Sequence, residues 1–322
     1  MASALLFPGQ GSQEPGMGRD AAEHDIRIMN LWKKAERLSG LDLRAIYWEG
    51  SEADMAATAS LQPGLTTANL AFWTLLSERF KPTATAGHSL GEYSALAAAG
   101  VLGEDAVLQL VTLRGRLMSQ ADPEGTGGMA AVVKLPLAAV QALIDESQKE
   151  SGEMLLLANY NTPGQFVASG ARGAIALLTD KVKAAKGRAI SLAVSGAFHS
   201  PLMAEAGAEL ASAIDALPKT AWNKARFPIY CNAAPHPQTD PDIIKDLLKR
   251  QMTSPVYWID SIRRQWDAGC RLFVECGPKG VLGKMVGPIL KEYVTAALPD
   301  AEESPWTVAN VGNLRQALDF QQ

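Results

Sequence analysis

The pentapeptide Gly-His-Ser-Leu-Gly at residues 87–91 lies between a short apolar run, residues 83–86, and a helical pattern that begins near Glu92. A serine with a glycine two positions away on each side is typical of a nucleophile elbow, a sharp strand-to-helix turn that exposes the serine hydroxyl. The same pattern also occurs by chance as a glycine-rich connector. Its place between a strand and a helix favours the elbow, with Ser89 as nucleophile and free N–H groups at the helix start.

Outside the elbow, short apolar runs alternate with longer helical patterns, which is the order of a parallel α/β sheet. The predicted strands cover residues 4–7, 83–86, 271–275 and 307–311. The predicted helices cover residues 24–39, 63–80, 92–99, 104–120, 201–217 and 242–250. The main body of the chain is therefore expected to be α/β.

The middle of the chain has a different order of predicted strands and helices. Its predicted elements are a strand at 129–134, a helix at 136–149, strands at 154–160 and 165–170, a helix at 171–186 and a strand at 188–194. This β-α-β-β-α-β order is that of a ferredoxin-like unit. We therefore expect residues 123–195 to form a small subdomain inserted into a body made of residues 1–122 and 196–322, with a cleft between them.

Composition limits the class of protein. The chain has 322 residues, of which 47% are hydrophobic and 20% charged, as in a soluble globular protein. Its 30 Lys and Arg against 34 Asp and Glu give a net charge of −4, and no long basic stretch is present. We therefore expect no nucleic-acid partner.

The cysteines and the N-terminal segment indicate the cellular compartment in which the protein is expected. Cys231, Cys270 and Cys276 form no C-x-x-C pair and have no companion histidine cluster, which fits neither a disulfide framework nor a zinc site. The apolar start of the chain is too short for a signal peptide, and no run approaches the ~18 apolar residues of a membrane span. We expect a cytoplasmic protein with no membrane segment and no metal.

A serine nucleophile needs a base, and the chain has four histidines. His24 and His236 lie in patterns typical of the solvated surface. His88 adjoins Ser89, but neighbours in a tight turn point apart, so a structural role is expected for it. His199 lies in the loop that returns from the inserted unit to the body, beside the expected cleft, and is the candidate base.

An ordinary serine hydrolase would place an acid between the serine and the histidine to orient the imidazole. The acids in that interval fall mostly on helices of the inserted unit. A Ser–Asp dyad is a less favoured interpretation than a Ser–His arrangement, because the chain lacks the Asp-Gly pair that such sites use. We therefore expect a Ser89–His199 dyad in which the second ring nitrogen donates to a backbone carbonyl.

The segment Phe-Pro-Gly-Gln-Gly-Ser-Gln at residues 7–13 is a glycine-rich loop after the first strand. It is not a dinucleotide loop, because Gly9 and Gly11 do not continue as G-x-G-x-x-G, and no P-loop lysine follows. Post-strand loops of a parallel sheet lie at one edge, so Gln10 is placed to bring a second N–H to the oxyanion.

Together these residues resemble the malonyl-CoA:acyl carrier protein transacylases, the acyltransferases that load extender units in fatty acid and polyketide synthesis. The resemblance covers nearly the whole chain. It rests on residues 7–13, 87–93, 113–118, 159–165, 196–200, 254–256 with the preceding Gln251, and 275–278. It implies a hydrolase-like parallel sheet body with an inserted ferredoxin-like subdomain.

The resemblance also assigns roles to residues. It implies that Ser89 is the acylated nucleophile, that His199 is the base and that the N–H groups of Gln10 and Leu90 form the oxyanion hole. It further implies that the main-chain carbonyl of Gln251 orients His199, which supplies the missing third member.

Two further positions bear on the substrate. By the same resemblance Arg114 is a clamp for a carboxylate, which a planar guanidinium binds through two parallel hydrogen bonds. Without the motif around it, Arg114 would be read as a helix-surface arginine. Phe198 resembles the malonyl-selecting form of its loop, in which a bulky ring leaves little room for a 2-methyl branch.

The reaction that these roles imply is ping-pong transfer of malonyl from coenzyme A to Ser89, and from there to the phosphopantetheine thiol of an acyl carrier protein. It needs no cofactor. No carrier motif is present in the chain, so the holo carrier is expected to act in trans. Basic residues that could dock an acidic carrier, or that simply form solvated helix faces, are Lys181, Lys183, Lys186, Arg188, Lys249, Arg250, Arg263 and Arg264.

Two other functions fit the same motifs. One is a thioesterase or esterase that uses the same dyad, and the other is a catalytically silent module that binds acyl-CoA or docks a carrier. Arg114 and the absent acid favour transfer over hydrolysis. The intact Ser89, His199 and donor loops argue against a silent module.

Overall fold

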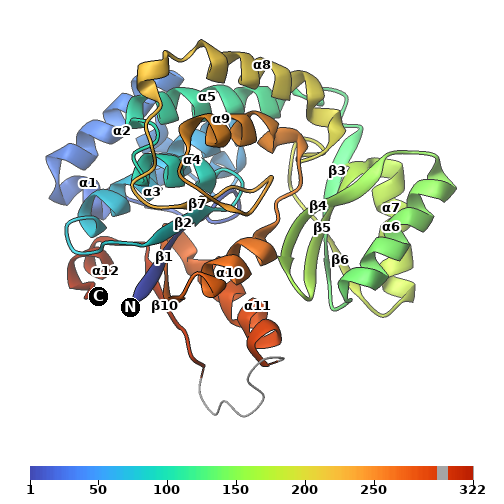
Figure 1. Cartoon of the computed structure of the whole chain (residues 1–322). Helices are drawn as coiled ribbons and strands as arrows, with labels where there is room; N and C mark the ends of the chain where they lie inside the picture. The colour runs from blue at the N-terminus through green and yellow to red at the C-terminus, as the bar shows by residue number, and fades with distance from the viewer. Residues whose placement is uncertain (296–303, 322) are drawn as a thin grey trace.

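The computed structural model describes residues 1–295 and 304–321, which form two β-sheets flanked by helices (Figure 1). The larger sheet has six strands in the order β10-β9-β1-β2-β7-β8, and each neighbouring pair is parallel except β7 with β8. Its strands are β1 (Ala2–Phe7), β2 (Ala84–Gly87), β7 (Ile229–Tyr230), β8 (Pro237–Gln238), β9 (Cys270–Cys276) and β10 (Thr307–Val311). The predicted α/β fold class is confirmed.

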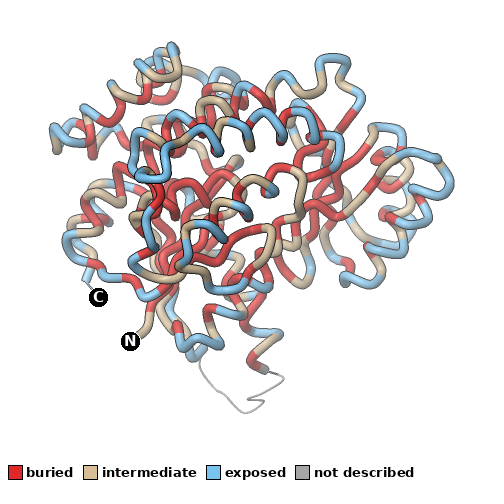
Figure 2. The backbone as a smooth tube through the Cα atoms, turned by 45° about the horizontal axis from the view of Figure 1, so that its top comes forward, coloured by how far each residue is buried: buried red, intermediate tan, exposed pale blue. Residues whose placement is uncertain are grey.

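Helices cover both faces of this sheet. They are α1 (Arg19–His24), α2 (Ile26–Ser39), α3 (Thr58–Leu76), α4 (Gly91–Ala98), α5 (Glu104–Gln120), α8 (Ala204–Ala216), α9 (Pro241–Arg250), α10 (Trp258–Asp267), α11 (Gly283–Thr295) and α12 (Leu314–Asp319). Successive side chains of a strand point to opposite faces. Accordingly, Leu5 and Phe7 of β1 pack in the core that contains α2 to α5, whereas Ala4 and Leu6 pack in a second core with α10 and α11. Figure 2 shows this buried centre.

The smaller sheet has four antiparallel strands in the order β4-β5-β3-β6. Its elements are β3 (Gly127–Val133), α6 (Leu137–Ser151), β4 (Leu155–Thr162), β5 (Gln165–Ala171), α7 (Arg172–Ala184) and β6 (Arg188–Ser191). They follow one another in the predicted β-α-β-β-α-β order. In Figure 1 the two helices lie on the side of the sheet that faces away from the body. The division of the chain at residues 123 and 195 stays a prediction.

Backbone hydrogen bonds join the small sheet to the segment of the body that precedes α10. The N–H of Tyr160 in β4 donates to the carbonyl of Val256 over 3.0 Å, and the N–H of Val256 donates to Ala158 over 2.8 Å. Residues of both sheets also share both hydrophobic cores. The small sheet is therefore packed firmly against the body, and this contact fixes one wall of the cavity described below.

Several predicted element boundaries were wrong. The helix predicted at 63–80 begins at Thr58 and ends at Leu76, so Pro63 is the sixth residue of α3 rather than part of its first turn, and α3 contains it despite the lost backbone hydrogen bond. The helix predicted at 24–39 is broken at Asp25, which is extended and caps α2 by accepting from the Arg27 N–H over 2.8 Å. The last strand of the small sheet ends at Ser191 rather than at 194, and the two-residue strands β7 and β8 were not predicted.

Glycines allow the elbow to form where β2 meets α4. A Cβ on Gly87 would lie 1.9 Å from the Gly91 carbonyl carbon, and a Cβ on Gly91 would lie 2.0 Å from the Phe7 carbonyl oxygen. A Cβ on Gly9 would lie 2.4 Å from the His88 carbonyl oxygen. These three glycines therefore let β1, β2 and α4 approach closely enough to place residues 8–10 beside Ser89.

We predict that Gly91→Ala destabilises the fold by about 3 kcal/mol or more, because the new methyl group meets backbone rather than a movable side chain. Thermal unfolding followed by circular dichroism measures the change. Gly164→Ala is the matched control: Gly164 lies in the turn between β4 and β5, has no positive φ and has open space around its Cβ position, so alanine there should change stability by no more than about 1 kcal/mol. Equal stability of the two variants would contradict the packing described here.

Candidate active site

Ser89 sits in the elbow with a strained backbone. Its φ is 50°, in the left-handed region that residues with a side chain rarely adopt. The side chain of Asn232 holds this turn from both sides: its Oδ1 accepts from the Ser89 N–H over 2.6 Å, and its Nδ2 donates to the Gly87 carbonyl over 2.6 Å. The strain at the nucleophile is therefore fixed by a buried amide from the loop after β7.

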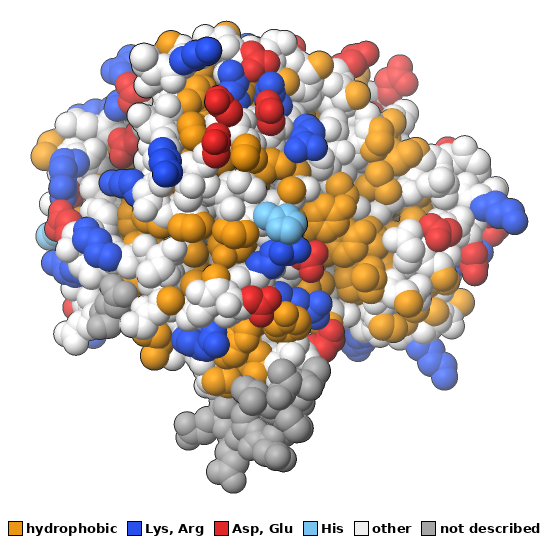
Figure 3. Space-filling model, in the orientation of Figure 1, with side chains coloured by type: hydrophobic (Ala, Val, Ile, Leu, Met, Phe, Trp, Pro, Cys, Tyr) orange, Lys and Arg blue, Asp and Glu red, His pale blue; other side chains and the backbone are white. Residues whose placement is uncertain are grey.

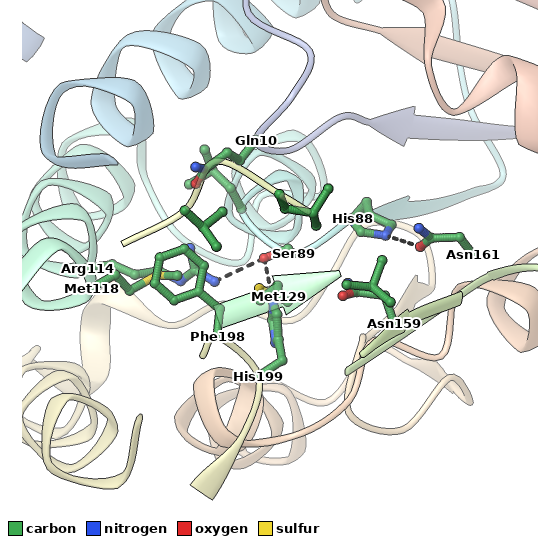
Figure 4. Close-up of a pocket in the computed structure, with 14 residues that line it drawn as sticks. Gln10, His88, Ser89, Arg114, Met118, Met129, Asn159, Asn161, Phe198 and His199 are labelled. Atoms are coloured by element: carbon green, nitrogen blue, oxygen red, sulfur yellow. Dashed lines mark hydrogen bonds between the residues drawn. The ribbon is translucent and has the colours of Figure 1, made fainter. Parts of the chain in front are cut away.

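His199 contacts the nucleophile directly. Its Nε2 lies 2.7 Å from the Ser89 Oγ, as Figure 4 shows. Its Nδ1 lies 3.1 Å from the Gln251 carbonyl oxygen and 3.0 Å from that of Ser254. Carbonyl oxygens only accept, so Nδ1 carries the proton and Nε2 is free to accept the serine proton. His199 also has a left-handed φ, 56°, which aims the ring into the cavity.

The environment of His199 keeps it neutral. Burial disfavours the imidazolium, and the nearby Arg114 charge adds to this effect, so the pKa of His199 falls from 6.5 to about 3. A histidine that stays unprotonated at neutral pH is ready to act as a base.

Arg114 of α5 is buried, with 1% of its surface exposed, and reaches the nucleophile. Its Nη2 donates to the Ser89 Oγ over 3.1 Å and to the Gln251 Oε1 over 3.2 Å, and its Nη1 donates to the Gln62 Oε1 over 2.8 Å. The guanidinium also lies 5.6 Å from the centre of the Tyr93 ring. Within the described part of the chain its Nε has no hydrogen-bond partner. Its hydrogen-bond partners are neutral side chains, and the nearby Glu92 carboxylate attracts its charge, so the buried guanidinium is stabilised in place and can receive an anion.

The nucleophile opens into a cavity between the two sheets, with about 640 Å³ of space that includes open solvent. Strands of the small sheet line one side of it, and loops and helix α5 of the body line the other; the lining residues are Gln10, His88, Ser89, Leu90, Arg114, Met118, Met129, Asn159, Asn161, Val167, Leu192, Val194, Phe198 and His199. Figure 4 shows Ser89 between Arg114 and His199. The predicted cleft thus contains six of the seven predicted site residues, with Gln251 behind it.

The predicted oxyanion donors lie on adjoining backbone segments. A Cβ on Gly9 would be 3.5 Å from the Leu90 nitrogen, so the loop that carries Gln10 contacts the start of α4. Both Gln10 and Leu90 line the cavity beside Ser89. This arrangement suits two N–H groups that share one developing oxyanion.

Four polar residues around the site were missed by the sequence analysis. Asn232 and Gln62 hold Ser89 and Arg114 as described above, and Asn161 places its Oδ1 2.8 Å from the His88 Nε2. That contact agrees with the structural role expected for His88. Glu92, which directly follows the elbow, is 1% exposed and accepts from the Asn232 N–H over 2.8 Å. In the sequence, the only indication of a role for Glu92 was its place in the segment 87–93, which carries part of the resemblance.

Other chemistry is not apparent in residues 1–295 and 304–321. This part of the chain holds no group of three or more His, Cys, Asp or Glu that could bind a metal. Cys231, Cys270 and Cys276 are buried as free thiols. No helix among these residues is long and apolar enough to cross a membrane.

Fold and site together define a serine-dependent acyl enzyme. The chain belongs to the acyl transferase family, since the model of the acyl transferase domain matches residues 4–318, and within it to the malonyl CoA-acyl carrier protein transacylases. The relative of that name from Bacillus subtilis is 37% identical over 306 residues, which cover 93% of this chain and 94% of the relative. The one from Haemophilus influenzae is 36% identical over 303 residues, covering 92% and 95%.

Solved structures agree with this assignment. An acyl carrier protein S-malonyltransferase from Vibrio cholerae superposes with a TM-score of 0.88 at 34% identity, covering 98% of each chain. A malonyl-transacylase in complex with its type II polyketide synthase acyl carrier protein gives 0.89 at 32% identity, covering 99% of this chain and 98% of that one. The protein is therefore an acyltransferase.

We predict that acylation of Ser89 by a neutral acyl-CoA shows no acid limb near pH 6.5. The lowered pKa of His199 means that the neutral base persists as pH falls through 6.5 toward 3, whereas a histidine of ordinary pKa would be about 90% protonated at pH 5.5. Single-turnover acylation by acetyl-CoA between pH 5 and 8 measures this. A tenfold fall in rate between pH 7.5 and 5.5 would contradict the assigned environment of the base.

Proposed function

We propose that this enzyme transfers a malonyl group from coenzyme A to the phosphopantetheine thiol of a holo acyl carrier protein, through a malonyl-Ser89 intermediate. The observation that carries the proposal is the buried Arg114 guanidinium 3.1 Å from the Ser89 Oγ. A cation at that place suits an acyl group that ends in a carboxylate, and malonyl is such a group.

The first half-reaction loads the serine. His199 accepts the Ser89 proton at Nε2 while Oγ attacks the thioester carbonyl, and the oxyanion forms beside the N–H groups of Gln10 and Leu90. The carbon–sulfur bond then breaks, and the coenzyme A thiolate takes the proton from His199. The Gln251 and Ser254 carbonyls accept from Nδ1 and stabilise the imidazolium in between.

The second half-reaction reverses these steps with a new thiol. The carrier's phosphopantetheine thiol loses its proton to His199 and attacks the serine ester, and Ser89 leaves with that proton. Water would compete for the same ester. The clamped carboxylate favours the thiol, because it fixes the acyl group in the orientation that the incoming thiol needs.

Acyl selection is proposed to depend on Arg114 and Phe198. Arg114 binds the carboxylate. When the acyl group has no carboxylate, the buried guanidinium keeps its neutral hydrogen-bond partners but has no bound anion, which is unfavourable. Phe198 is 5% exposed and lines the cavity, where its ring limits the space for a branch at the second carbon of the acyl group. The pair thus favours malonyl over acetyl and over methylmalonyl.

The carrier is proposed to dock in trans near the cavity mouth. On the face in Figure 3, hydrophobic side chains gather between the body and the small sheet. Several predicted docking cations are engaged elsewhere: Lys181 pairs with Glu150 over 2.8 Å, and Arg263 pairs with Glu292 over 3.1 Å. Lys249 likewise pairs with two carboxylates, Asp215 and Asp246. For these three residues the structure favours the alternative of a solvated helix face.

The proposed reaction takes its acyl group from a coenzyme A thioester and uses no further cofactor. We also propose a cytoplasmic site for it, in keeping with three free buried thiols. Hydrolysis by the same dyad is the second candidate, because Ser89 and His199 alone would also serve a thioesterase. Arg114 favours transfer of a carboxylate-bearing group.

Intact-mass measurement tests the proposal. Incubation with malonyl-CoA should add one malonyl group to the chain, and later addition of holo acyl carrier protein should move that group to the carrier. Acetyl-CoA under the same conditions should label poorly. Rapid loss of the malonyl group to water, with none on the carrier, would instead show a thioesterase.

We predict that Ser89→Ala forms no malonyl adduct, because among the described residues that line the cavity with Gln10 and Leu90 only Ser89 carries a hydroxyl or thiol. Mass spectrometry after incubation with malonyl-CoA measures the adduct, with the wild type as the positive control. Stoichiometric labelling of the variant would assign the nucleophile to another residue.

We predict that Arg114→Ala reverses acyl preference. The variant should lose most malonyl transfer yet accept acetyl as well as or better than the wild type, because acetyl no longer leaves a buried cation unpaired, a cost of about 1.5–3 kcal/mol or roughly ten- to hundredfold in rate. Acylation kinetics with malonyl-CoA and acetyl-CoA on both proteins measure this. An unchanged preference for malonyl would remove Arg114 from substrate selection.

A further inference from the structure

Glu92 is a buried carboxylate that the proposed reaction does not use. It lies three residues after Ser89, is 1% exposed and is at the start of α4. Its Oε2 accepts two hydrogen bonds, from the Asn232 N–H over 2.8 Å and from the Gln251 Nε2 over 3.1 Å. Burial of a carboxylate costs desolvation free energy unless hydrogen bonds and nearby charges compensate it.

The two donors both serve the active site. Asn232 holds the strained Ser89 turn through its side chain, as described above. Gln251 supplies a carbonyl to His199, and its side-chain amide lies among Ser89, Glu92 and Arg114. One carboxylate thus joins the loop after β7 and the turn after α9 to the elbow.

The orientation of the Gln251 amide decides what Arg114 meets. The Nε2 donates to the Ser89 carbonyl over 2.9 Å and to Glu92, so the Oε1 must face the other way, where it accepts from Arg114. A guanidinium has only donors, so the reverse orientation would place N–H groups against N–H groups. Glu92 is one of two acceptors that prevent that reversal.

The charge of Glu92 supports the same role. Burial raises its pKa to about 6, while the hydrogen bonds from Asn232 and Gln251 and the Arg114 charge oppose this rise. At neutral pH the group is therefore mostly an anion that can only accept. Cys231 and Tyr93, the other titratable groups against this cluster, have raised pKa values and stay protonated.

We propose that Glu92 is a positioning residue for acyl selection: by fixing the Gln251 amide with its oxygen toward Arg114, it keeps the guanidinium aimed at the acyl group on Ser89. The inference rests on the proposed malonyl transfer. It predicts that loss of the Glu92 acceptor harms malonyl loading more than acetyl loading.

The test is a double-mutant cycle read as the ratio of malonyl to acetyl acylation rates. The proteins are the wild type, Glu92→Ala, Gln251→Met and the double variant. Glu92→Ala and Gln251→Met should each lower the ratio about tenfold, the worth of a hydrogen bond to a charged group. In the double variant the ratio should equal that of Gln251→Met alone, because Glu92 acts through Gln251.

Two further variants serve as controls. Glu92→Gln keeps an oxygen that can accept both N–H groups and should keep the ratio within about threefold of the wild type. Gln265→Met replaces a fully buried glutamine of α10 that has no hydrogen-bond partner for either amide atom among the described residues, and should leave the ratio unchanged. Thermal unfolding checks that each variant is folded.

The outcomes separate the two proposals. A wild type without preference for malonyl overturns the proposed function itself. A wild type with that preference, combined with an equal loss of malonyl and acetyl loading in Glu92→Ala, reduces Glu92 to support of the elbow and overturns the inference. If Glu92→Ala does not fold, Gln251→Met decides: a ratio equal to that of the wild type overturns the inference.

Discussion

The hydrogen bond between the buried Arg114 guanidinium and the Ser89 hydroxyl is the constraint on which the site depends. A cation without solvent needs partners, and here these are the neutral oxygens of Gln62, Gln251 and Ser89. Burial and, second to it, the charge of the same cation lower the pKa of His199 and so keep the base free of a proton. Arg114 thus contributes both to substrate selection and to the readiness of the base.

The second constraint is backbone strain. Ser89 and His199 both have left-handed φ angles, 50° and 56°, without being glycine. Such conformations persist only where the surrounding structure holds them. At Ser89 that hold comes from close glycine contacts and from Asn232. The large buried sheet and its two cores therefore act as the rigid support for two residues with strained backbones, whose side chains meet in the cavity.

Much of this could be predicted from the sequence, for identifiable reasons. The elbow at residues 87–91 is local, so its glycines reveal both the turn and the nucleophile. His199 could be chosen because its loop joins the inserted unit to the body. Arg114 looks like any helix arginine in isolation, and only the resemblance of the surrounding motif gave it a role.

Other features could not be read from local patterns. Asn232 follows a strand of two residues, too short to give an apolar period, and its partners lie more than 140 positions away. The side-chain contacts of Gln251 with Arg114 and Glu92 likewise depend on how α9 packs on the elbow. Pro63 misled the helix boundary because proline usually marks the first turn of a helix, whereas in α3 it is the sixth residue. In each case tertiary packing, rather than local sequence propensity, determines the observed contact or helix boundary.

The claim at the centre of this account is that Arg114 receives the carboxylate of the acyl group carried by Ser89. A crystal structure of the wild type after brief exposure to malonyl-CoA, with the malonyl ester trapped on Ser89, tests it most directly. Each oxygen of the malonyl carboxylate should lie within hydrogen-bond distance of an Arg114 nitrogen, with the Gln251 oxygen still facing that residue. A malonyl ester whose carboxylate points to solvent or to another side chain, with Arg114 still bound to Gln62 and Gln251 alone, would contradict it.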